Sequence, residues 1–203
     1  EVIDNAVDEA LAGHANKISI IVYKDGSLSV EDNGRGMPID IHPEYGQSGI
    51  EIIMTKLHAG GKFSTDNYQF SGGLHGVGIS VVNALSNRVE VTVQRQGNVY
   101  QMAFEHGEPV SALEVLAGKA PKRASGTMVH FWPDAKYFDS PKFALKALKH
   151  NLKAKAVLAA GLQIVYIDQM NNEKIEWQFE NGLVDYLMDE LQDRDIIPCP
   201  AFV

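Results

Sequence analysis

The sequence predicts an α+β fold, a two-layer sandwich in which helices cover a β-sheet. Segments with strand character come in adjacent pairs joined by short turns, whereas segments with helical periodicity are grouped elsewhere along the chain. The chain of 203 residues is 45% hydrophobic and 22% charged, which provides enough apolar material for the core of one large domain.

The first part of the chain is predicted to contain a helix, a hairpin and a second helix. Residues 1–12 have helical periodicity, with apolar and polar faces cleanly separated. Residues 17–23 and 27–31 have strand character on either side of a Lys-Asp-Gly turn, which is a hairpin signal. Residues 33–38 contain two glycines and a proline and are predicted to turn sharply. Residues 47–58 return to helical periodicity.

The middle of the chain is predicted to hold a loop, a helix and a second hairpin. Residues 59–73 are polar, contain several glycines and have no period, which is typical of a mobile loop. Residues 79–86 are expected to be helical. Residues 88–96 and 99–104 alternate between apolar and polar side chains, as half-buried strands do, and Gly97-Asn98 is the expected two-residue turn between them.

The last part of the chain begins with a weakly patterned stretch, residues 110–125, and a short strand at residues 128–132. Ser140-Pro141 offers an N-cap and a first-turn proline for a helix that runs to about residue 159. The remaining elements are two strands and a closing helix, expected at residues 162–168, 174–179 and 181–192.

The composition excludes several classes of protein. No apolar run approaches the ~20 residues of a membrane helix and no secretory signal is visible, so no membrane partner is expected. A single cysteine, Cys199, excludes an internal disulfide framework and fits a reducing compartment such as the cytoplasm. The formal net charge of −8 argues against a basic nucleic-acid-binding surface on this chain.

Four glycines lie between residues 70 and 80, directly before the third predicted helix. A glycine cluster that opens a helix can seat a phosphate, because backbone N–H groups approach the anion and the helix N-terminus adds a positive dipole. The P-loop pattern does not fit, since Gly60-Gly61-Lys62 is followed by Phe63. The dinucleotide fingerprint needs a strand directly before the glycines, and residues 64–69 are polar. A flexible hinge with a helix cap is the alternative.

The polar face of the first predicted helix carries carboxylates and an amide, with no cation four residues on to offset them. Glu1, Asn5, Asp8 and Glu9 fall in one arc, with Asp4 at its edge. Glu1, Asn5 and Asp8 lie on successive turns and are expected to point into one space. Mg²⁺ takes oxygen ligands, often only one from protein, and a carboxylate one turn away could polarise water toward a phosphorus atom. An ordinary acidic surface is the alternative.

An acid and a hydroxyl stand at the ends of two other predicted strands. Asp32 precedes the glycine turn, where its carboxylate could accept a hydrogen bond from an adenine amino group. It could equally be a turn-forming residue without a ligand. Ser125-Gly126-Thr127 opens a later strand and offers a hydroxyl, but this pattern is too short to assign by itself.

In this order, the four segments resemble the motifs of the GHKL ATPases, which include type IIA topoisomerase B subunits, Hsp90, MutL and sensor histidine kinases. The matching patterns are Glu1-x-x-x-Asn5-x-x-Asp8-Glu9, Asp32-x-Gly34-x-Gly36, Gly73-x-x-Gly76-x-Gly78 and Gly126-Thr127. Longer stretches such as EVIDNAVDEALAGHA and SGGLHGVGISVVNALS resemble the bacterial type IIA B subunits in particular. The stretches NYQF and WPDAKYFDSPKF are more similar to the topoisomerase IV branch (ParE) than to the gyrase branch, which is the alternative.

The resemblance implies a GHKL (Bergerat) fold, a mixed sheet of about eight strands covered by helices on one face. It implies that Glu1 is the general base, Asn5 the Mg²⁺ ligand and Asp32 the adenine-reading acid, helped by Gly36 and Thr127. Arg35 is expected to pair with Glu9, and Arg95 to stand near the pocket mouth, where competitive inhibitors reach. The phosphate cradle, the lid lysine and the remaining pocket-wall residues correspond to Gly73, Leu74, His75, Gly76, Val77, Gly78 and Ile79, to Lys62, and to Met37 and Pro38.

The resemblance also implies ATP and Mg²⁺ as cofactors. It further implies that residues 1–203 are a fragment of a longer B subunit. An N-terminal arm that crosses to a second B subunit would precede Glu1, and a transducer domain would follow Val203, so slow hydrolysis by the fragment is expected. The implied partners are a topoisomerase A subunit (ParC-like), a second B subunit, duplex DNA through other domains, and ATP-competitive inhibitors. The alternatives are a different GHKL ATPase or a non-enzymatic nucleotide sensor.

Overall fold

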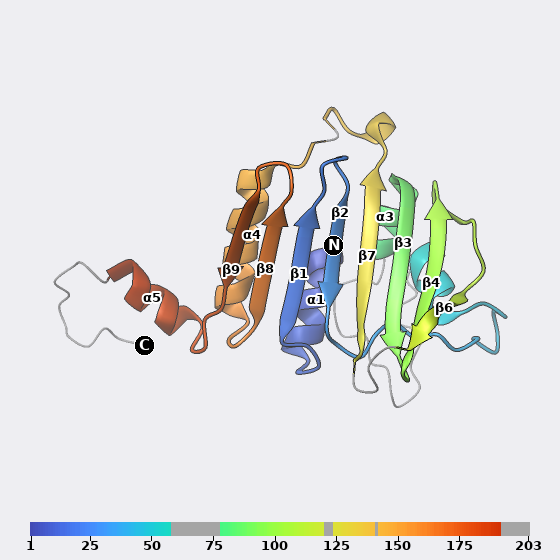
Figure 1. Cartoon of the computed structure of the whole chain (residues 1–203), viewed down its shortest axis with the longest axis horizontal. Helices are drawn as coiled ribbons and strands as arrows, with labels where there is room; N and C mark the ends of the chain where they lie inside the picture. Colours follow the sequence, from blue (N-terminus) through green and yellow to red (C-terminus); the bar gives the residue numbers. More distant parts are fainter. Residues whose placement is uncertain (58–77, 120–123, 141, 192–203) are drawn as a thin grey trace.

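The computed structural model describes residues 1–57, 78–119, 124–140 and 142–191. In this part of the chain, helices cover one face of a single mixed sheet and leave the other face open (Figure 1). The expected α+β two-layer sandwich is therefore confirmed, with nine strands where about eight were expected.

The sheet places strands from distant parts of the chain side by side. The strand order is β5-β4-β3-β7-β2-β1-β8-β9, with β6 beside β4. All neighbours are antiparallel except β1 and β8, which are parallel. The bounds are β1 (Lys17–Val22), β2 (Leu28–Asp32), β3 (Ser86–Arg95), β4 (Asn98–Glu105), β5 (Glu108–Pro109), β6 (Glu114–Lys119), β7 (Gly126–Pro133), β8 (Gln163–Asp168) and β9 (Glu173–Trp177).

Helices α1 to α4 lie behind the sheet in Figure 1, and α5 stands beyond the β9 edge. The helices are α1 (Val2–Leu11), α2 (Gly49–Thr55), α3 (Gly78–Ala84), α4 (Leu145–Leu158) and α5 (Leu183–Leu191), with a 3-10 turn at Ala135–Tyr137. Ser48 caps helix α2: its side chain accepts a hydrogen bond from the Glu51 N–H and so satisfies one free donor of the first turn.

The core lies between the sheet and the helices, and strand alternation decides which residues enter it. Ile18 and Ile20 of β1, and Val89 and Val91 of β3, are completely buried because every second side chain points to the covered face. Full burial of one such aliphatic side chain stabilises the fold by roughly 1.5–3 kcal/mol. Helices α1 to α4 add a few buried residues each, such as Ala6 of α1 and Leu152 of α4, whereas no residue of α5 is buried.

The second hairpin turns one residue earlier than expected. Arg95 pairs with Asn98, so Gln96 and Gly97 form the turn, with φ of 54° and 77°. Both angles are positive, as the two-residue turn that follows strand twist requires. Gly97 was the residue that predicted a turn here, but it occupies the second position of the turn instead of the first.

The structure also differs from the sequence-based expectation at residues 110–125 and at the start of α4. Residues 110–125 have only a weak sequence pattern and no element was assigned to them, yet they contain β6, which pairs with β4. Ser140 does not cap a helix, and its hydroxyl accepts a hydrogen bond from the Lys142 N–H at 3.3 Å. Helix α4 begins at Leu145 after Ala144, which makes no side-chain cap.

Replacing Gln96 with Asn should stabilise the fold, because Asn tolerates the positive φ of the turn better than Gln does. For Gln96→Asn we expect the free energy of unfolding, measured by urea denaturation, to rise by roughly 0.5 kcal/mol. The matched change Gly97→Ala should lower it by about 1 kcal/mol. Equal stability of the two variants would contradict this description of the turn.

Candidate functional site

A carboxylate occupies a core-facing position at the end of β2. Leu28 and Val30 on the same face of β2 are each only 2% exposed, and Asp32 continues their alternation. Burial raises the pKa of Asp32 to about 6, and the Glu9 carboxylate adds to this, while the hydrogen bond from the Gly34 N–H opposes it. Strand alternation directs the Asp32 side chain toward the core, where a charged carboxylate lowers the stability of the fold. A carboxylate kept at such a position points to a functional role for Asp32.

Asp32 also forms the turn that follows it. Its Oδ1 accepts a hydrogen bond from the Gly34 N–H at 2.8 Å. A Cβ on Gly34 would overlap the side chain of Glu9, so only glycine fits between α1 and this turn. The sequence left open whether Asp32 forms a turn or faces a ligand site. The structure shows the turn and places the same residue in the wall of a pocket.

The pocket lies between the start of α1 and the middle of the sheet and contains about 430 Å³ of empty space, part of it open to solvent. Its polar groups come from Asp32, Thr127, Asn5 and Glu9, and its other walls are largely apolar. This combination of an apolar cleft with a few polar groups is typical of small-molecule sites. The remaining lining residues are Val2, Ala6, Val30, Gly36, Met37, Ile79 and Val129.

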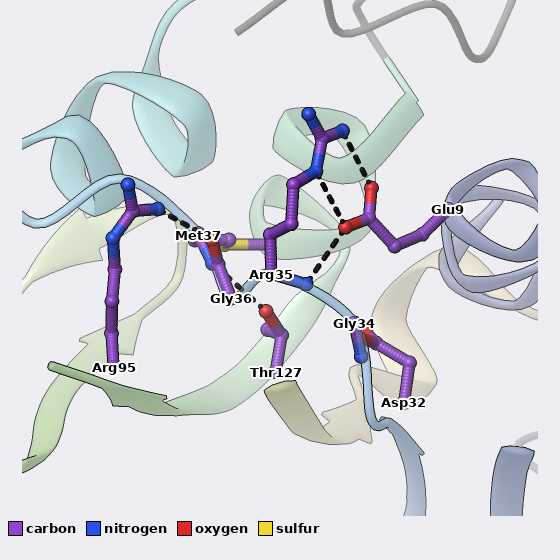
Figure 2. A network of polar contacts seen from close by, with 8 residues as sticks. All are labelled: Glu9, Asp32, Gly34, Arg35, Gly36, Met37, Arg95 and Thr127. Carbon is purple, nitrogen blue, oxygen red and sulfur yellow. Dashed lines mark hydrogen bonds and ion pairs between the residues drawn. The ribbon is translucent and has the colours of Figure 1, made fainter. Parts of the chain in front are cut away.

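An ion pair fixes one wall of the pocket. Glu9 accepts three hydrogen bonds from Arg35, one from its backbone N–H at 2.8 Å and two from its guanidinium at 2.9 Å each (Figure 2). Burial opposes ionisation of Glu9, but the bonds from Arg35 outweigh it and hold the pKa of Glu9 below its usual range. The expected pairing of Arg35 with Glu9 is confirmed.

The turn after β2 is also tied to the neighbouring strands. The Met37 N–H donates to Thr127 Oγ1 at 3.0 Å, and Arg95 Nη1 donates to the Gly36 carbonyl at 3.0 Å (Figure 2). Gly36 has a φ of 76°, and a Cβ there would lie 3.0 Å from the Gln94 carbonyl oxygen. Thr127 and Arg95 therefore hold the turn against β7 and β3, beside the pocket.

Pro38, expected in the pocket wall, is buried against the start of α2. A Cβ on Gly49 would lie 2.5 Å from the Pro38 carbonyl oxygen, so these two residues are in close contact. Pro38 is not among the residues that line the pocket.

The polar residues of α1 separate into different surroundings. Asn5 lines the pocket. Glu1 lines an adjoining apolar groove with α3, and its carboxylate lies so close to Gly78 that a Cβ there would overlap it. Asp8 lines neither cavity. Burial raises its pKa, and Asp4 adds to this while Lys155 opposes it. The expectation that Glu1, Asn5 and Asp8 share one space is therefore wrong, because Asn5 and Glu1 line different cavities and Asp8 lines neither.

The acidic face of α1 is partly compensated by distant cations. Lys155 of α4 forms an ion pair with Asp4, and Arg35 forms one with Glu9. No lysine or arginine stands four residues after the acidic residues of α1. The cations that pair with them, Lys155 and Arg35, come from other segments of the chain.

Several expected site residues lie outside the described residues, namely Lys62, Gly73, Leu74, His75, Gly76 and Val77. Of the glycine-rich segment, Gly78 and Ile79 are described. Gly78 is the first residue of α3, one before the expected helix start, and Ile79 is 6% exposed and lines the pocket.

The sequence interpretation missed the apolar part of the pocket, which is formed by Val2, Ala6, Val30 and Val129. A signal for two of them existed. Val30 stands two residues before Asp32, and Val129 two residues after Thr127, so each shares a sheet face with a residue that was identified.

The described residues contain no group of three or more histidine, cysteine, aspartate or glutamate side chains arranged to hold a metal ion. None of the helices in the described ranges has the length and apolar character needed to cross a membrane.

The fold and the pocket agree with the family comparison. Residues 1–136 match the family model described as histidine kinase-, DNA gyrase B- and HSP90-like ATPase, and the chain belongs to this family of ATPases. Over 202 residues, all of this chain and 32% of the relative, it is 61% identical to the B subunit of DNA topoisomerase 4 from Pseudomonas aeruginosa. It is 51% identical over 187 residues, 92% of this chain and 29% of the relative, to the B subunit of DNA gyrase from Thermotoga maritima. The chain therefore spans about a third of the length of these relatives.

Solved structures show the same fold. The topoisomerase IV ATP-binding domain of Francisella tularensis, in complex with a small-molecule inhibitor, superposes with a TM-score of 0.82 at 51% identity, over 95% of this chain and 51% of that chain. The 43K ATPase domain of Thermus thermophilus gyrase B, in complex with an aminocoumarin, superposes with a TM-score of 0.84 at 37% identity, over 97% of this chain and 49% of that chain. The expected GHKL fold is confirmed.

The buried charge of Asp32 should cost stability in a pH-dependent way. The pKa of Asp32 in the folded chain, about 6, lies above its unfolded value, so the ionised carboxylate destabilises the fold at neutral pH. For Asp32→Asn, which keeps an acceptor for the Gly34 N–H, we expect a free energy of unfolding about 1–2 kcal/mol higher than wild type at pH 7.5. The difference should shrink as the pH falls through 6 toward 4.

Asp25 provides a control of opposite sign. Hydrogen bonds from Ser27 lower the pKa of Asp25 to about 2, so Asp25→Asn should reduce stability at pH 7.5. Urea denaturation across this pH range measures both variants. If Asp32→Asn were as destabilising as Asp25→Asn at pH 7.5, the buried-charge description of Asp32 would be wrong.

Proposed function

We propose that this chain is the ATP-binding and hydrolysing domain of the B subunit of DNA topoisomerase IV. In the whole enzyme, ATP binding would close a dimer gate on duplex DNA for strand passage, giving decatenation and relaxation of supercoils. The observation that carries the proposal is a single pocket with the Asp32 carboxylate in one wall and the Asn5 amide in another, in a chain of this ATPase family.

The equivalent domain of the gyrase B subunit, whose activity is negative supercoiling, is the second candidate. Topoisomerase 4 relatives range from 53% to 61% identity over essentially the whole chain, whereas two gyrase relatives reach 47% and 51% over 188 and 187 residues. This difference favours topoisomerase IV.

The sheet end of the pocket suits an adenine ring. The Asp32 carboxylate would accept a hydrogen bond from the adenine amino group, with Gly36 and Thr127 beside it and Arg35 and Pro38 in or behind the wall. Val30 and Val129 would contact the face of the ring, since both line the pocket as the cross-strand pair two positions from the Asp32–Thr127 pair. Arg95, at the end of β3, would contact larger ATP-competitive inhibitors from its position beside the Gly36 turn.

The helix end of the pocket suits the phosphates. Gly78 and Ile79 begin α3, and the backbone N–H groups of residues 73–79 would bind the triphosphate oxygens, with Lys62 as the lid cation. Asn5 offers one amide oxygen in a pocket wall, which fits Mg²⁺ because this ion commonly takes one or two protein oxygens and completes its shell with water and phosphate. When bound there, Mg²⁺ would neutralise part of the phosphate charge.

Glu1 is the proposed general base. Its carboxylate would accept a proton from a water molecule as the water oxygen bonds to the γ-phosphorus. The bond from that phosphorus to the bridging oxygen then breaks, which leaves ADP and inorganic phosphate. Asp32 and Asn5 would hold the nucleotide so that its γ-phosphate lies near Glu1, at the start of the same helix that carries Asn5.

The remaining proposals concern the whole enzyme. Residues 1–203 would form the GHKL domain, preceded by an arm that crosses to a second B subunit and followed by a transducer domain that supplies a lysine to the γ-phosphate. A ParC-like A subunit and duplex DNA would bind through other domains, in the bacterial cytoplasm. The isolated chain would bind ATP as a monomer but hydrolyse it slowly.

Replacing Glu1 should separate hydrolysis from binding. In the full-length subunit assembled with its A subunit, Glu1→Ala should reduce kcat for ATP by at least about 100-fold, since it removes the base that activates water. ATP binding, measured by calorimetry, should stay within about threefold of wild type, because Glu1 lies outside the nucleotide pocket.

The matched change Asp32→Ala should have the opposite signature, with loss of ATP binding in the chain itself. A subunit in which Glu1→Ala kept full turnover would exclude Glu1 as the base. A wild-type subunit that bound ATP without ever hydrolysing it would support the nucleotide-sensor alternative. The gyrase alternative is tested separately: negative supercoiling by the wild-type enzyme would indicate gyrase, and decatenation would indicate topoisomerase IV.

A further inference from the structure

An ion pair links α1 to α4, two helices that are far apart in the chain. Lys155 Nζ donates a hydrogen bond to Asp4 Oδ1. Asp4 stands directly before Asn5 and three residues after Glu1, so the link is made within the turn of α1 that carries both proposed functional groups.

The Lys155 end of this link is on a firmly packed helix. Leu152 and Ala156, on either side of Lys155 in α4, are completely buried, and α4 packs on β8. Strand β8 pairs in parallel register with β1, the strand that follows α1. Lys155 therefore extends from a fixed part of the core.

Helix α1 is weakly restrained against rotation about its axis by its own packing. Its buried residues are Val2, Ala6 and Val7, all of which are small and 4–7% exposed, and the Glu1 side chain makes no cap hydrogen bond. Within the described part of the chain, two ion pairs between side chains hold α1 to other segments, Glu9–Arg35 and Asp4–Lys155.

These two ion pairs lie on opposite sides of Asn5. On a helical wheel at 100° per residue, Asn5 falls between Asp4 and Glu9. A helix held at both flanks cannot roll without breaking one pair, so the direction of the Asn5 side chain is determined from both sides.

We propose that Lys155 is a positioning residue for ATP hydrolysis, which holds α1 in the rotation that places Asn5 and Glu1 correctly. The inference rests on the proposed function. Rolling a helix by about 20° moves a side-chain atom ~6 Å from its axis by about 2 Å. Misplacement by ~1 Å can cost up to about 100-fold in rate. An incompletely held α1 should therefore lower kcat more than it weakens ATP binding.

A purely electrostatic role for Lys155 predicts a different result. Without Lys155, the Asp4 carboxylate would stand unpaired near the proposed triphosphate site and repel it. That change would raise KM and leave kcat unaltered, and removing the Asp4 charge as well would reverse it.

The test measures steady-state ATP hydrolysis by the full-length subunit with its A subunit. The Glu1 amine lies 3.4 Å from Asp4 in this chain. In a subunit that carries the proposed N-terminal arm, this nitrogen would be part of a peptide bond and could not replace Lys155. For Lys155→Met we expect kcat to fall about tenfold with KM within about twofold of wild type. Asp4→Asn and the double variant should give the same loss, since each breaks the same link. Lys155→Arg should retain wild-type kcat within about twofold.

Lys153→Met is the matched control, because Lys153 lies on the same helix but pairs with Glu190 of α5. It should leave kcat unchanged. A second measurement does not depend on activity: in NMR spectra of this chain with its N-terminal amine acetylated, so that the amine cannot pair with Asp4, Lys155→Met should shift the side-chain amide signals of Asn5, and Lys153→Met should not.

An unchanged kcat in Lys155→Met would overturn the proposal. So would a raised KM in Lys155→Met that returns to the wild-type value when Asp4→Asn is added. An unmoved Asn5 signal would overturn it as well, even if the subunit proved inactive. Failure of the proposed function would give different results. In that case the wild-type subunit would not hydrolyse ATP, or the Glu1→Ala variant would remain active.

Discussion

The site depends on one buried carboxylate at the end of a central strand. Asp32 follows Leu28 and Val30 on the covered face of β2, and the sheet register sets it opposite Thr127 of β7. Burial makes the charged form costly, so the surrounding chain is arranged to tolerate it. The Gly34 N–H binds it directly, and the turn that this bond creates brings Arg35 to Glu9 and Met37 to Thr127.

Glycine is required at this site because three segments of the chain, β2, β7 and α1, approach one another closely. Gly34 leaves room for the Glu9 side chain, and a Cβ on Gly126 would overlap the Asp32 carbonyl oxygen. Without these contacts, β2, β7 and α1 could not meet around one pocket. The pocket therefore follows from the sheet order, which places β7 beside β2 although about a hundred residues separate them.

Features encoded by neighbouring residues could be predicted from the sequence. The α+β class, the first hairpin and the position of Asp32 at the end of a strand follow from alternation and turn residues. Non-local features could not. Lys155 pairs with Asp4 across 151 residues, so helical spacing gave no sign of the cation that offsets the acidic face of α1. Strand β6 pairs with β4 despite its weak pattern, and Gln96 adopts a positive φ that its side chain does not favour. The roles of Glu1, Asn5 and the glycine-rich segment are proposals, which rest on the motifs together with the position of α1 and α3 beside the pocket.

The account is tested most directly by the protonation of Asp32 with and without nucleotide. The carboxyl carbon of Asp32, followed by ¹³C NMR over pH, should report a pKa of about 6 in the free chain. If the ionised carboxylate accepts a hydrogen bond from adenine, saturating ATP with Mg²⁺ should lower that pKa, while tripolyphosphate with Mg²⁺, which lacks the base, should not. A pKa that ATP leaves unchanged or raises would contradict the central role assigned to this carboxylate.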